Sequence, residues 1–577
     1  DTTDTTDTTD TTDTTTTVTP PDSPTLSLTP KTIKTFSFNW ADVSDETEYR
    51  LLENPDGASG FSQIATLAAD TIEHDIAVLL PARINASYML QACNSGGCSD
   101  SNTVTVTDSL TDEIGYIKAS NTEANDSFGL AIALSGDGNT LAVGAPYEDS
   151  NATTIDGAQD NNDVTSSGAV YVFYRDGLTW TQQAYIKASN ASGNDLFGSS
   201  LAFSNDGNTL AVGAVQADTV QADPTVGGSG AAYIYTRVGT TWSEQAIIEA
   251  SNPDSSDYFG HSLALSGDGN TLAVGAIWED GSDVGVYAEN DNAATDAGAV
   301  YLFTRDGTNW SQEAYVKASN TGASDNFGFS VALSDDGTTL AVGAWSENGD
   351  AVGIDGADNN NAGDSGAVYL FTNDGGNWSQ QAYIKASNTE AWDEFGHAVA
   401  LSADGNTLAV SAPGEDNEFG TDGAANNNSA EDSGAVYLFT RSGTTWSQQA
   451  YIKASNAKTG DVFGHSLALS DDGNILAVGA TDESSNATGI NGDQTDTSAS
   501  LSGAAYLFTR NNELWSQQAY IKAPNAEADD EFGTGIALDG NGNTLAVAAP
   551  YEASSVSGIN GDQTDNSASY SGAVYLY

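Results

Sequence analysis

The feature that most constrains this chain is a Phe-Gly pair that returns seven times at nearly constant spacing. The pair begins at Phe128, Phe197, Phe259, Phe327, Phe395, Phe463 and Phe532, so successive copies lie 69, 62, 68, 68, 68 and 69 residues apart. A repeat at a fixed period of this length is typical of chains in which one small unit is copied and stacked. The fold must therefore bury seven equivalent units against one another.

Each repeat contains four short runs in which apolar residues alternate with small or polar ones. In the fourth repeat the runs read SVALS, TLAVGA, GAVYLF and WSQQAYIKA, and turns such as DDGTT and NDGGN separate them. Alternation with period 2 between Gly- and Asp-rich turns predicts β-strands. Four strands in each of seven repeats predict an all-β fold with a seven-bladed β-propeller over residues 113–577.

The two ends of the repeat region complement each other. The last repeat stops at SGAVYLY, its third strand, and a spare fourth strand, EIGYIKAS (113–120), precedes the first repeat. Pairing the two would close the ring and cover an edge that a linear array leaves open. We therefore expect the N-terminal strand to complete the seventh blade.

The stretches FG, LAVGAP (141–146) and SGAVYLF (365–371) resemble the FG-GAP repeats of the integrin α-subunit propeller and its bacterial relatives. The resemblance implies that the Phe fills the space between neighbouring blades and that the Gly lets backbones approach closely. Integrin blades carry a DxDxDGxxD calcium run between their first and second strands. This chain has only SGDGNT there, so the integrin ligands are not carried over.

Two further regions precede the repeats. Residues 1–24 form an Asp/Thr tract with almost nothing to bury, which predicts a disordered tether. Residues 25–108 contain about seven short alternating runs, which predict a small β-sandwich. Trp40, Tyr49 and ASYMLQACNSGGCSDS resemble a fibronectin type III domain, which implies a spacer or an adhesive module. Cys93 and Cys98 are predicted to form a disulfide in an oxidising compartment.

The charge of the chain excludes several partners. Its 80 acidic and 16 basic residues leave a formal net charge of −64, which repels nucleic acid and anionic lipid. No apolar run reaches the roughly 18 residues of a membrane span. The only methionine is Met89, which favours processing of the chain and removal of a secretion signal. We expect an extracellular protein at a bacterial cell surface.

Catalytic patterns are missing from the sequence. It has no Ser-His-Asp order, no zinc-spaced Cys/His cluster, no Walker loop and no GxGxxG after a strand. His261, His397 and His465 share one repeat position, which holds Leu130 and Phe329 in other copies. Because a catalytic position does not tolerate such residues, we interpret these histidines as packing or surface groups. We expect no enzymatic activity and no catalytic residues.

Two charged positions recur with the repeat. The YIKA lysine of the fourth strand occurs six times and is replaced by Glu249 in the second repeat. A lysine on an outer strand discourages strand addition by neighbours, so we interpret these lysines as solubility devices. An aspartate stands two residues before every repeated Phe. We predict that it caps a turn by bonding to local backbone amides.

The long loops between the second and third strands contain no Lys or Arg and are rich in oxygen ligands. They include IDGAQDNND (155–163), IDGADNNN (354–361), TDGAANNN (421–428) and two copies of GINGDQTD (489–496 and 558–565). Carboxylates and amides beside a Gly suit calcium, and acidic loops without internal cations repel themselves. The predicted ligands are Asp156, Asp160, Asp163, Asp355, Asp358, Asp422, Asn491, Asp493, Asp496, Asn560, Asp562 and Asp565. Metal-free turns and adaptation to salty water are the alternative interpretations.

These observations lead to two hypotheses of function. An acidic, Lys-poor β-protein with such loops resembles the surface-layer and matrix proteins of marine bacteria. It would self-associate into a calcium-stabilised coat, surface layer or biofilm matrix, and calcium would also bridge it to polysaccharide or lipopolysaccharide of the cell surface. The alternative is an adhesin whose integrin-like propeller binds a protein or glycan ligand.

Overall fold

The computed structural model describes residues 18–107, 109–218, 227–288, 291–357, 359–417 and 428–577. Strands dominate these ranges, and their one assigned helix is a 3-10 turn, η1 (Leu80–Ala82). None of the described segments forms a helix with the length and apolar character needed to cross a bilayer. The chain divides into two compact units: the second holds residues 109–577 with 32–34 and 78–81, and the first holds the remaining residues up to 108.

The first unit contains two antiparallel sheets. One has the order β1 (Ser27–Lys31), β2 (Thr35–Asn39), β5 (Glu73–Ala77). The other has the order β4 (Ser62–Ala68), β3 (Glu48–Asn54), β6 (Ser87–Asn94), β7 (Gly97–Asp100), with β8 (Val104–Thr105) also paired to β6. The ring of Tyr88 on β6 contacts Phe36 and Phe38 on β2, so the sheets face each other across an aromatic core. The predicted β-sandwich is confirmed.

The residues just before the first sheet contact the rest of this unit, including its β6–β7 hairpin. Asn94 Nδ2 donates to the carbonyl of Thr19 at 2.9 Å, and Pro21 and Pro24 are buried. The predicted disordered tether (1–24) therefore extends too far towards the C-terminus. Its last prolines have apolar surface and are buried in the unit. Residues 1–17 lie outside the described ranges. Cys93 and Cys98 face each other in register on this hairpin and form a disulfide.

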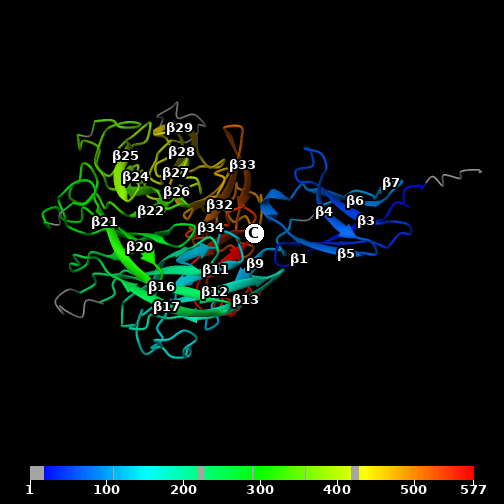
Figure 1. Ribbon diagram of the computed structural model, residues 1–577, viewed down its shortest axis with the longest axis horizontal. Coiled ribbons are helices and arrows are strands. Elements are labelled where there is room, and N and C mark those ends of the chain that lie inside the picture. Colours follow the sequence, from blue (N-terminus) through cyan, green and yellow to red (C-terminus); the bar gives the residue numbers. More distant parts are fainter. Residues whose placement is uncertain (1–17, 108, 219–226, 289–290, 358, 418–427) are drawn as a thin grey trace, which may run out of the picture. The chain divides into compact units, whose positions relative to one another are not determined.

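The second unit consists of seven four-stranded antiparallel sheets, which are the blades of a propeller (Figure 1). Blades 1 and 2 comprise β10 (Ala131–Leu134), β11 (Thr140–Ala145), β12 (Ala169–Asp176), β13 (Thr179–Ile186), β14 (Phe197–Phe203), β15 (Thr209–Ala214), β16 (Ala231–Val238) and β17 (Thr241–Ile248). Blades 3 and 4 comprise β18 (Phe259–Leu265), β19 (Thr271–Ala276), β20 (Ala299–Asp306), β21 (Asn309–Val316), β22 (Ser330–Leu333), β23 (Thr339–Ala344), β24 (Ala367–Asp374) and β25 (Asn377–Ile384). Blades 5 and 6 comprise β26 (Val399–Leu401), β27 (Thr407–Ala412), β28 (Ala435–Ser442), β29 (Thr445–Ile452), β30 (Phe463–Leu469), β31 (Ile475–Ala480), β32 (Ala504–Asn511) and β33 (Leu514–Ile521).

Blade 7 joins the two ends of the repeat region. It comprises β34 (Ile536–Leu538), β35 (Leu545–Ala549), β36 (Ala573–Leu576) and, as its outer strand, β9 (Gly115–Ile117). Tyr575 on β36 pairs with Tyr116 on β9 in antiparallel register, and the label of β9 lies beside the red strands in Figure 1. The predicted closure of the last blade by the N-terminal strand is confirmed.

Neighbouring blades form separate ladders and meet through packed side chains and through backbone hydrogen bonds, such as that from the amide of Phe197 to the carbonyl of Ser167 at 3.3 Å. Between blades 1 and 2, Phe197 is buried with Val170 and Val172 of the preceding blade. Gly198, the Gly of this Phe-Gly pair, has φ +95°, and a Cβ there would stand 2.7 Å from the carbonyl oxygen of Ala169 in the preceding blade. The Phe therefore fills the gap and the Gly permits the close approach, as predicted.

Candidate functional site

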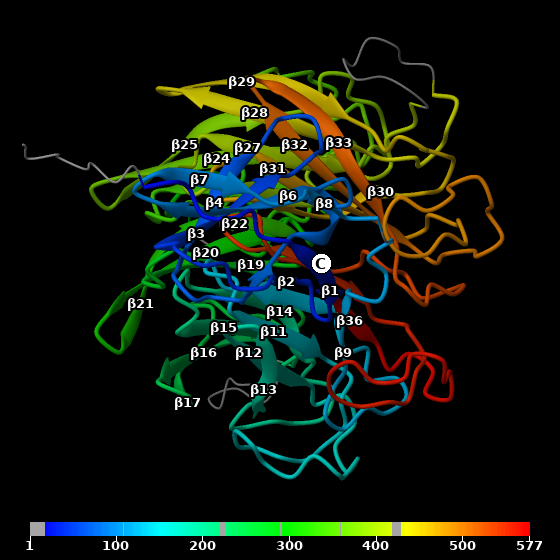
Figure 2. The same ribbon diagram turned by 90° about the vertical axis from the view of Figure 1, so that its right-hand side faces the viewer.

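The loops between the second and third strands of each blade lie at the same end as the segment that precedes each Phe-Gly. We call this end the loop face; the long loops after β31 and β35 (orange and red) extend beyond their strands in Figure 2. The two kinds of segment are joined between blades: the amide of Leu196 donates to the carbonyl of Ser166 at 3.1 Å. The predicted calcium ligands that the structure describes lie on this face.

Four predicted ligands at one equivalent repeat position hold their loop against the outer strand. Each accepts the backbone N–H of the outer-strand tyrosine through its side chain, at 2.9 to 3.1 Å, and donates its own N–H to that tyrosine's carbonyl, at 2.7 to 2.8 Å. All four have φ near +54°, a conformation that Asp and Asn tolerate. They are Asp156, Asp355, Asn491 and Asn560.

Most of the other described ligands accept bonds from their own loops. Asp493 and Asp562 accept the amide and hydroxyl of the Thr two residues later, at 2.7 to 3.0 Å. Asp163, Asp496 and Asp565 accept side-chain or backbone donors nearby. Asp160 is exposed, and Asp358 and Asp422 lie outside the described residues. These contacts are those of Asp and Asn in metal-free turns.

Acidic side chains close enough to share a metal ion occur elsewhere. Among the described residues, the only group of three His, Cys, Asp or Glu ligand atoms within 4.8 Å of one another is Asp42, Glu46 and Asp70, in the N-terminal unit. Asp42 accepts the hydroxyl of Tyr49 and Glu46 accepts the amide of Asp70. The predicted loop ligands do not form such a group within the described ranges.

A buried ion pair is the feature of the loop face that sequence reasoning missed. In blade 4, Lys385 Nζ lies 2.7 Å from Glu347 Oε2 and donates to Ser365 Oγ at 2.7 Å. The hydroxyl of Tyr383 donates to Glu347 Oε1 at 3.1 Å. The lysine side chain is 0% exposed, so the interpretation of these lysines as solubility devices on an outer edge is wrong. Because Glu347 begins the long loop, the lysine neutralises that loop from inside.

The same pair recurs in every blade except blade 2, where all of its members change together. Nζ–Oε2 distances are 2.7 to 3.1 Å in the pairs Lys118–Glu552, Lys187–Glu148, Lys317–Glu279, Lys385–Glu347, Lys453–Glu415 and Lys522–Glu483. Burial lowers the pKa of five of these lysines, and the paired glutamate opposes that shift: they are Lys118, Lys187, Lys317, Lys453 and Lys522. Blade 2 has Ala217, Ile247 and Glu249 in place of the Glu, Tyr and Lys. This joint replacement is the sequence signal that would have revealed the network.

The aspartates that precede the repeated Phe residues cap turns, as predicted. Six of them accept the backbone N–H three residues earlier at 2.7 to 2.9 Å: Asp195, Asp257, Asp325, Asp393, Asp461 and Asp530. Burial and then nearby Glu415 raise the pKa of Asp393 to about 8. Burial raises the pKa of Asp195, in blade 2, to only about 6. The charges near Asp195 are those of Asp218, which raises its pKa, and Lys187, which lowers it; blade 2 has no counterpart of Glu415.

The histidines pack, as predicted. Phe329 lies between His261 and His397, with ring centroids 5.0 Å from each, and His397 lies 5.3 Å from His465. Burial lowers the pKa of His261 to about 4 and that of His397 to about 3. These imidazoles are therefore neutral at physiological pH.

The propeller arginines lie at the end of the blades opposite the loop face. The guanidinium carbon of each lies 5.2 to 5.7 Å from the ring centroid of a Trp on the fourth strand, in the pairs Arg175–Trp180, Arg237–Trp242, Arg305–Trp310, Arg441–Trp446 and Arg510–Trp515. Each Nε also donates to an Asn in the turn between the first two strands. These arginines brace the hairpins of their blades.

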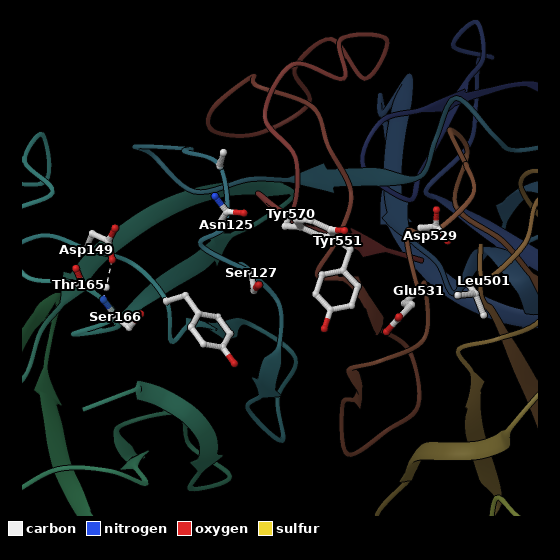
Figure 3. A pocket seen from close by; sticks show the side chains of 12 residues that line it. Asn125, Ser127, Asp149, Thr165, Ser166, Leu501, Asp529, Glu531, Tyr551 and Tyr570 are labelled. Atoms are coloured by element: carbon white, nitrogen blue, oxygen red, sulfur yellow. Dashed lines mark hydrogen bonds between the residues drawn. The ribbon is translucent and has the colours of Figure 1, made fainter. Parts of the chain in front are cut away.

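A pocket of about 780 Å³ opens on the loop face where blades 6, 7 and 1 meet. Its lining includes Tyr147, Tyr551 and Tyr570, and Figure 3 shows Tyr551 between Ser127 and Glu531. The equivalents of Tyr570 in the other blades are Ser166, Gly228, Asp296, Asp364, Asp432 and Leu501. Tyr570 has φ +58°, which is costly for a bulky residue and is tolerated where the surrounding structure enforces it. Tyr570 therefore departs from the repeat at this pocket.

Comparisons with known proteins identify the repeats. A family model described as FG-GAP repeat matches residues 112–173, 180–235, 242–303, 310–371, 378–439, 446–508 and 515–577. The chain is similar to the RRP9 WD40 repeats at 8% identity, with 80% of this chain and 96% of that chain covered and a TM-score of 0.41. It is similar to an auxiliary nutrient binding protein from Bacteroides ovatus at 9% identity, with 96% and 98% covered and a TM-score of 0.32. FN3tt is 20% identical over 15% of this chain and 99% of its own, with a TM-score of 0.13. No curated protein matches the chain.

Proposed function

This chain belongs to the FG-GAP repeat family, and we propose that it is a non-enzymatic adhesin of the bacterial cell surface. In this proposal the propeller is a rigid scaffold, and the pocket where blades 6, 7 and 1 meet holds the ligand. The N-terminal unit is a fibronectin type III-like spacer; its two facing sheets and its contact between Trp40 and Tyr49, with ring centroids 5.5 Å apart, support that role.

The observation that carries the proposal is the placing of three tyrosines around one pocket. Specific ligand sites are typically concave, lined by aromatic residues and equipped with a few polar groups. Tyr147 and Tyr570 are 43% and 48% exposed, although burying a Tyr ring is normally favourable. Tyr570 is held at a strained turn position, and its exposed ring and that of Tyr147 have no evident role in packing the blades, so we assign them to a ligand.

Adhesion by full-length variants tests this proposal. Beads coated with the parent chain are expected to be retained by polysaccharide, lipopolysaccharide or protein surfaces, and the Tyr551→Ala, Tyr570→Ala double variant to lose most of that retention. Trp392→Ala is the matched control, because Trp392 is 65% exposed and does not line this pocket. If the double variant adheres as well as the parent, or if the parent adheres to none of these surfaces, the adhesin proposal is wrong.

The second candidate function is a calcium-stabilised coat that self-associates into a surface layer or matrix. The observation that favours it is that nearly all Lys and Arg side chains of the propeller are engaged by groups within the blades. Six lysines are buried in ion pairs and five arginines lie over Trp rings, which leaves Lys458 as the remaining basic residue of the repeats. The surface is therefore more anionic than composition alone indicates, and neighbouring copies would need bridging cations.

Melting curves and negative-stain microscopy test the coat proposal. Calcium that binds only the folded state stabilises it by about 2.7 kcal/mol at a hundredfold excess over Kd, so chelation is expected to lower the Tm and calcium to restore it. Sodium chloride at matched ionic strength is the control for screening. If sodium restores the Tm equally well, the acidity reflects salt adaptation. If calcium restores the Tm without producing sheets, the coat proposal is wrong.

A further inference from the structure

The chemistry of the tyrosine pocket narrows the class of ligand that it would hold. We propose that the pocket binds an organic cation, a guanidinium or ammonium group on an apolar stem such as the end of an Arg or Lys side chain. This inference rests on the proposed adhesin function and names the part of the ligand that enters the pocket.

The aromatic rings supply one half of the recognition. Tyr551 and Tyr570 meet edge to face, with ring centroids 5.2 Å apart and planes at 88°, so their faces point in different directions. Tyr147 and Tyr570 are about half exposed and leave ring surface open to a ligand. A cation over such a face is attracted by the ring quadrupole, and an apolar stem packs against the same surface.

The carboxylates supply the other half. Asp149, Asp529 and Glu531 line the pocket, and the described lining residues include no Lys, Arg or His. Asp149 Oδ1 accepts the amide of Ser166 at 2.7 Å, which fixes its orientation (Figure 3). Burial and then nearby Asp482 and Asp529 raise the pKa of Glu531. A bound cation would relieve this crowding of negative charge.

In blade 3 the aromatic residues at the same repeat positions pack against each other. Tyr258 and Trp278 are the equivalents of Glu531 and Tyr551. Their rings stack on each other with centroids 4.1 Å apart, and Gln216 Nε2 donates to the Tyr258 hydroxyl at 3.0 Å. In that pair the ring faces cover each other. Around the pocket Tyr551 and Tyr570 meet edge to face, so ring faces remain open to a ligand.

A metal ion fits this pocket less well than an organic cation. Calcium takes six to eight oxygen ligands, and tyrosine rings offer it none. Asp149, Asp529 and Glu531 do not belong to a described group of carboxylates within 4.8 Å of one another. Three separated carboxylates around aromatic faces instead match a larger cation whose charge is spread over several donors.

Calorimetric titration of the full chain with small probes tests the assignment. The probes are acetyl-Gly-Arg-Gly-amide, the same peptide with Lys, and the same peptide with citrulline, the neutral isostere of Arg. The Arg or Lys peptide is expected to bind at least about tenfold more tightly than the citrulline peptide. Raising sodium chloride from about 50 to about 500 mM is expected to weaken that binding several-fold.

The matched pair of variants is Glu531→Gln and Glu394→Gln. Glu394 occupies the same repeat position in blade 5 and is also buried enough to raise its pKa, to about 7, but it lies outside the pocket lining. Glu531→Gln is expected to weaken binding about fivefold to tenfold, and Glu394→Gln to leave it within twofold. Equal loss in both variants would indicate a general effect of charge and overturn the assignment.

The remaining outcomes separate this inference from the proposed function. Equal binding of the Arg and citrulline peptides, or no binding of any of the three, overturns the cation assignment. N-acetylglucosamine serves as a neutral sugar probe. If it binds and Tyr551→Ala abolishes its binding while the peptides do not bind, the cation assignment is wrong and the adhesin proposal stands. The bead-retention experiment tests the adhesin proposal separately, because it uses no added cation.

Discussion

Blade 2 and blade 4 share a backbone and differ in what they bury. Their second and third strands pair in the same register, with Val212 opposite Tyr233 in one and Val342 opposite Tyr369 in the other. Blade 4 encloses the Lys385–Glu347 pair, whereas blade 2 has a buried alanine and a partly exposed Glu249 at the two positions. The ion pair is therefore dispensable for the blade fold, but its members depend on one another.

The physical reason is the cost of an uncompensated buried charge. Removing one partner of a buried ion pair leaves the other unpaired and costs about 3–5 kcal/mol, whereas replacing both with apolar groups is often neutral. In blade 2 an alanine replaces the buried Glu and the partly exposed Glu249 replaces the Lys, so no buried charge is left unpaired. Its Ser229 Oγ is buried and has no hydrogen-bond partner in the described chain, while Ser365 in blade 4 accepts from Lys385.

The largest expected effect comes from breaking the pair in blade 4. Lys385→Met leaves Glu347 buried without its cation and is expected to lower the free energy of unfolding by about 3–5 kcal/mol. Chemical denaturation followed by fluorescence measures the change. Glu249→Ala, at the same repeat position of blade 2, is the control and is expected to cost less than about 0.5 kcal/mol.

The double variant Lys385→Met, Glu347→Ala sharpens that result. Because it removes both partners of the buried ion pair, it is expected to recover at least half of the stability that Lys385→Met loses. A double variant that is less stable than the single one would contradict the interdependence of the two residues. The pair would then stabilise the blade in a way that apolar replacement does not match.

An intermediate effect is expected from pH. The capping aspartates have folded-state pKa values raised above the unfolded value, to about 7 for Asp257, Asp461 and Asp530 and about 8 for Asp393. Their contribution to stability is full below the unfolded pKa near 4 and is lost as pH rises through 7 to 8. Each of these aspartates is therefore expected to contribute about 2–4 kcal/mol more to the free energy of unfolding at pH 5 than at pH 8.

Relief of general charge repulsion also favours the folded state at lower pH, so a control is needed. Asp393→Asn removes the group with the highest of these pKa values and is expected to reduce the pH dependence at high salt, where surface repulsion is screened. Asp195→Asn in blade 2 is expected to reduce it less, because the pKa of Asp195 is raised only to about 6. Identical pH profiles for both variants and the parent would contradict a role for these aspartates.

The smallest expected change in stability comes from rebuilding the network in blade 2. The triple variant Ala217→Glu, Ile247→Tyr, Glu249→Lys restores the three groups found in the other blades and gives Ser229 a donor. We expect the free energy of unfolding to change by less than about 1 kcal/mol. NMR titration is the sharper measurement: the new glutamate is expected to raise the pKa of Asp195. An unchanged Asp195 pKa would mean that the neighbouring Glu is not what separates blade 2 from the others.

The sequence by itself determined the parts of this protein that repeat locally. Alternating runs such as TLAVGA and GAVYLF predicted the strands, because successive side chains of a strand point to opposite faces and the alternation is visible in consecutive residues. The spare strand before the first Phe-Gly and the missing one after the last predicted closure, and Tyr116 opposite Tyr575 confirms it. The aspartate before each Phe was predictable for the same reason, since it bonds to an amide only three residues away.

Only the tertiary structure decided which polar groups are buried and which residues meet across the ring. Lys385 looks like a solvated lysine on an outer strand until the loop that begins at Glu347 folds over it. Asp156 and Asp355 belong to residue types that serve metals and turns alike, and only their bonds to Tyr185 and Tyr383 assign them to the turn. Tyr147 and Tyr551 lie in the first and last repeats and line one pocket because the ring closes. Burial and charge partners depend on contacts between distant segments, and periodicity along the chain carries no record of those contacts.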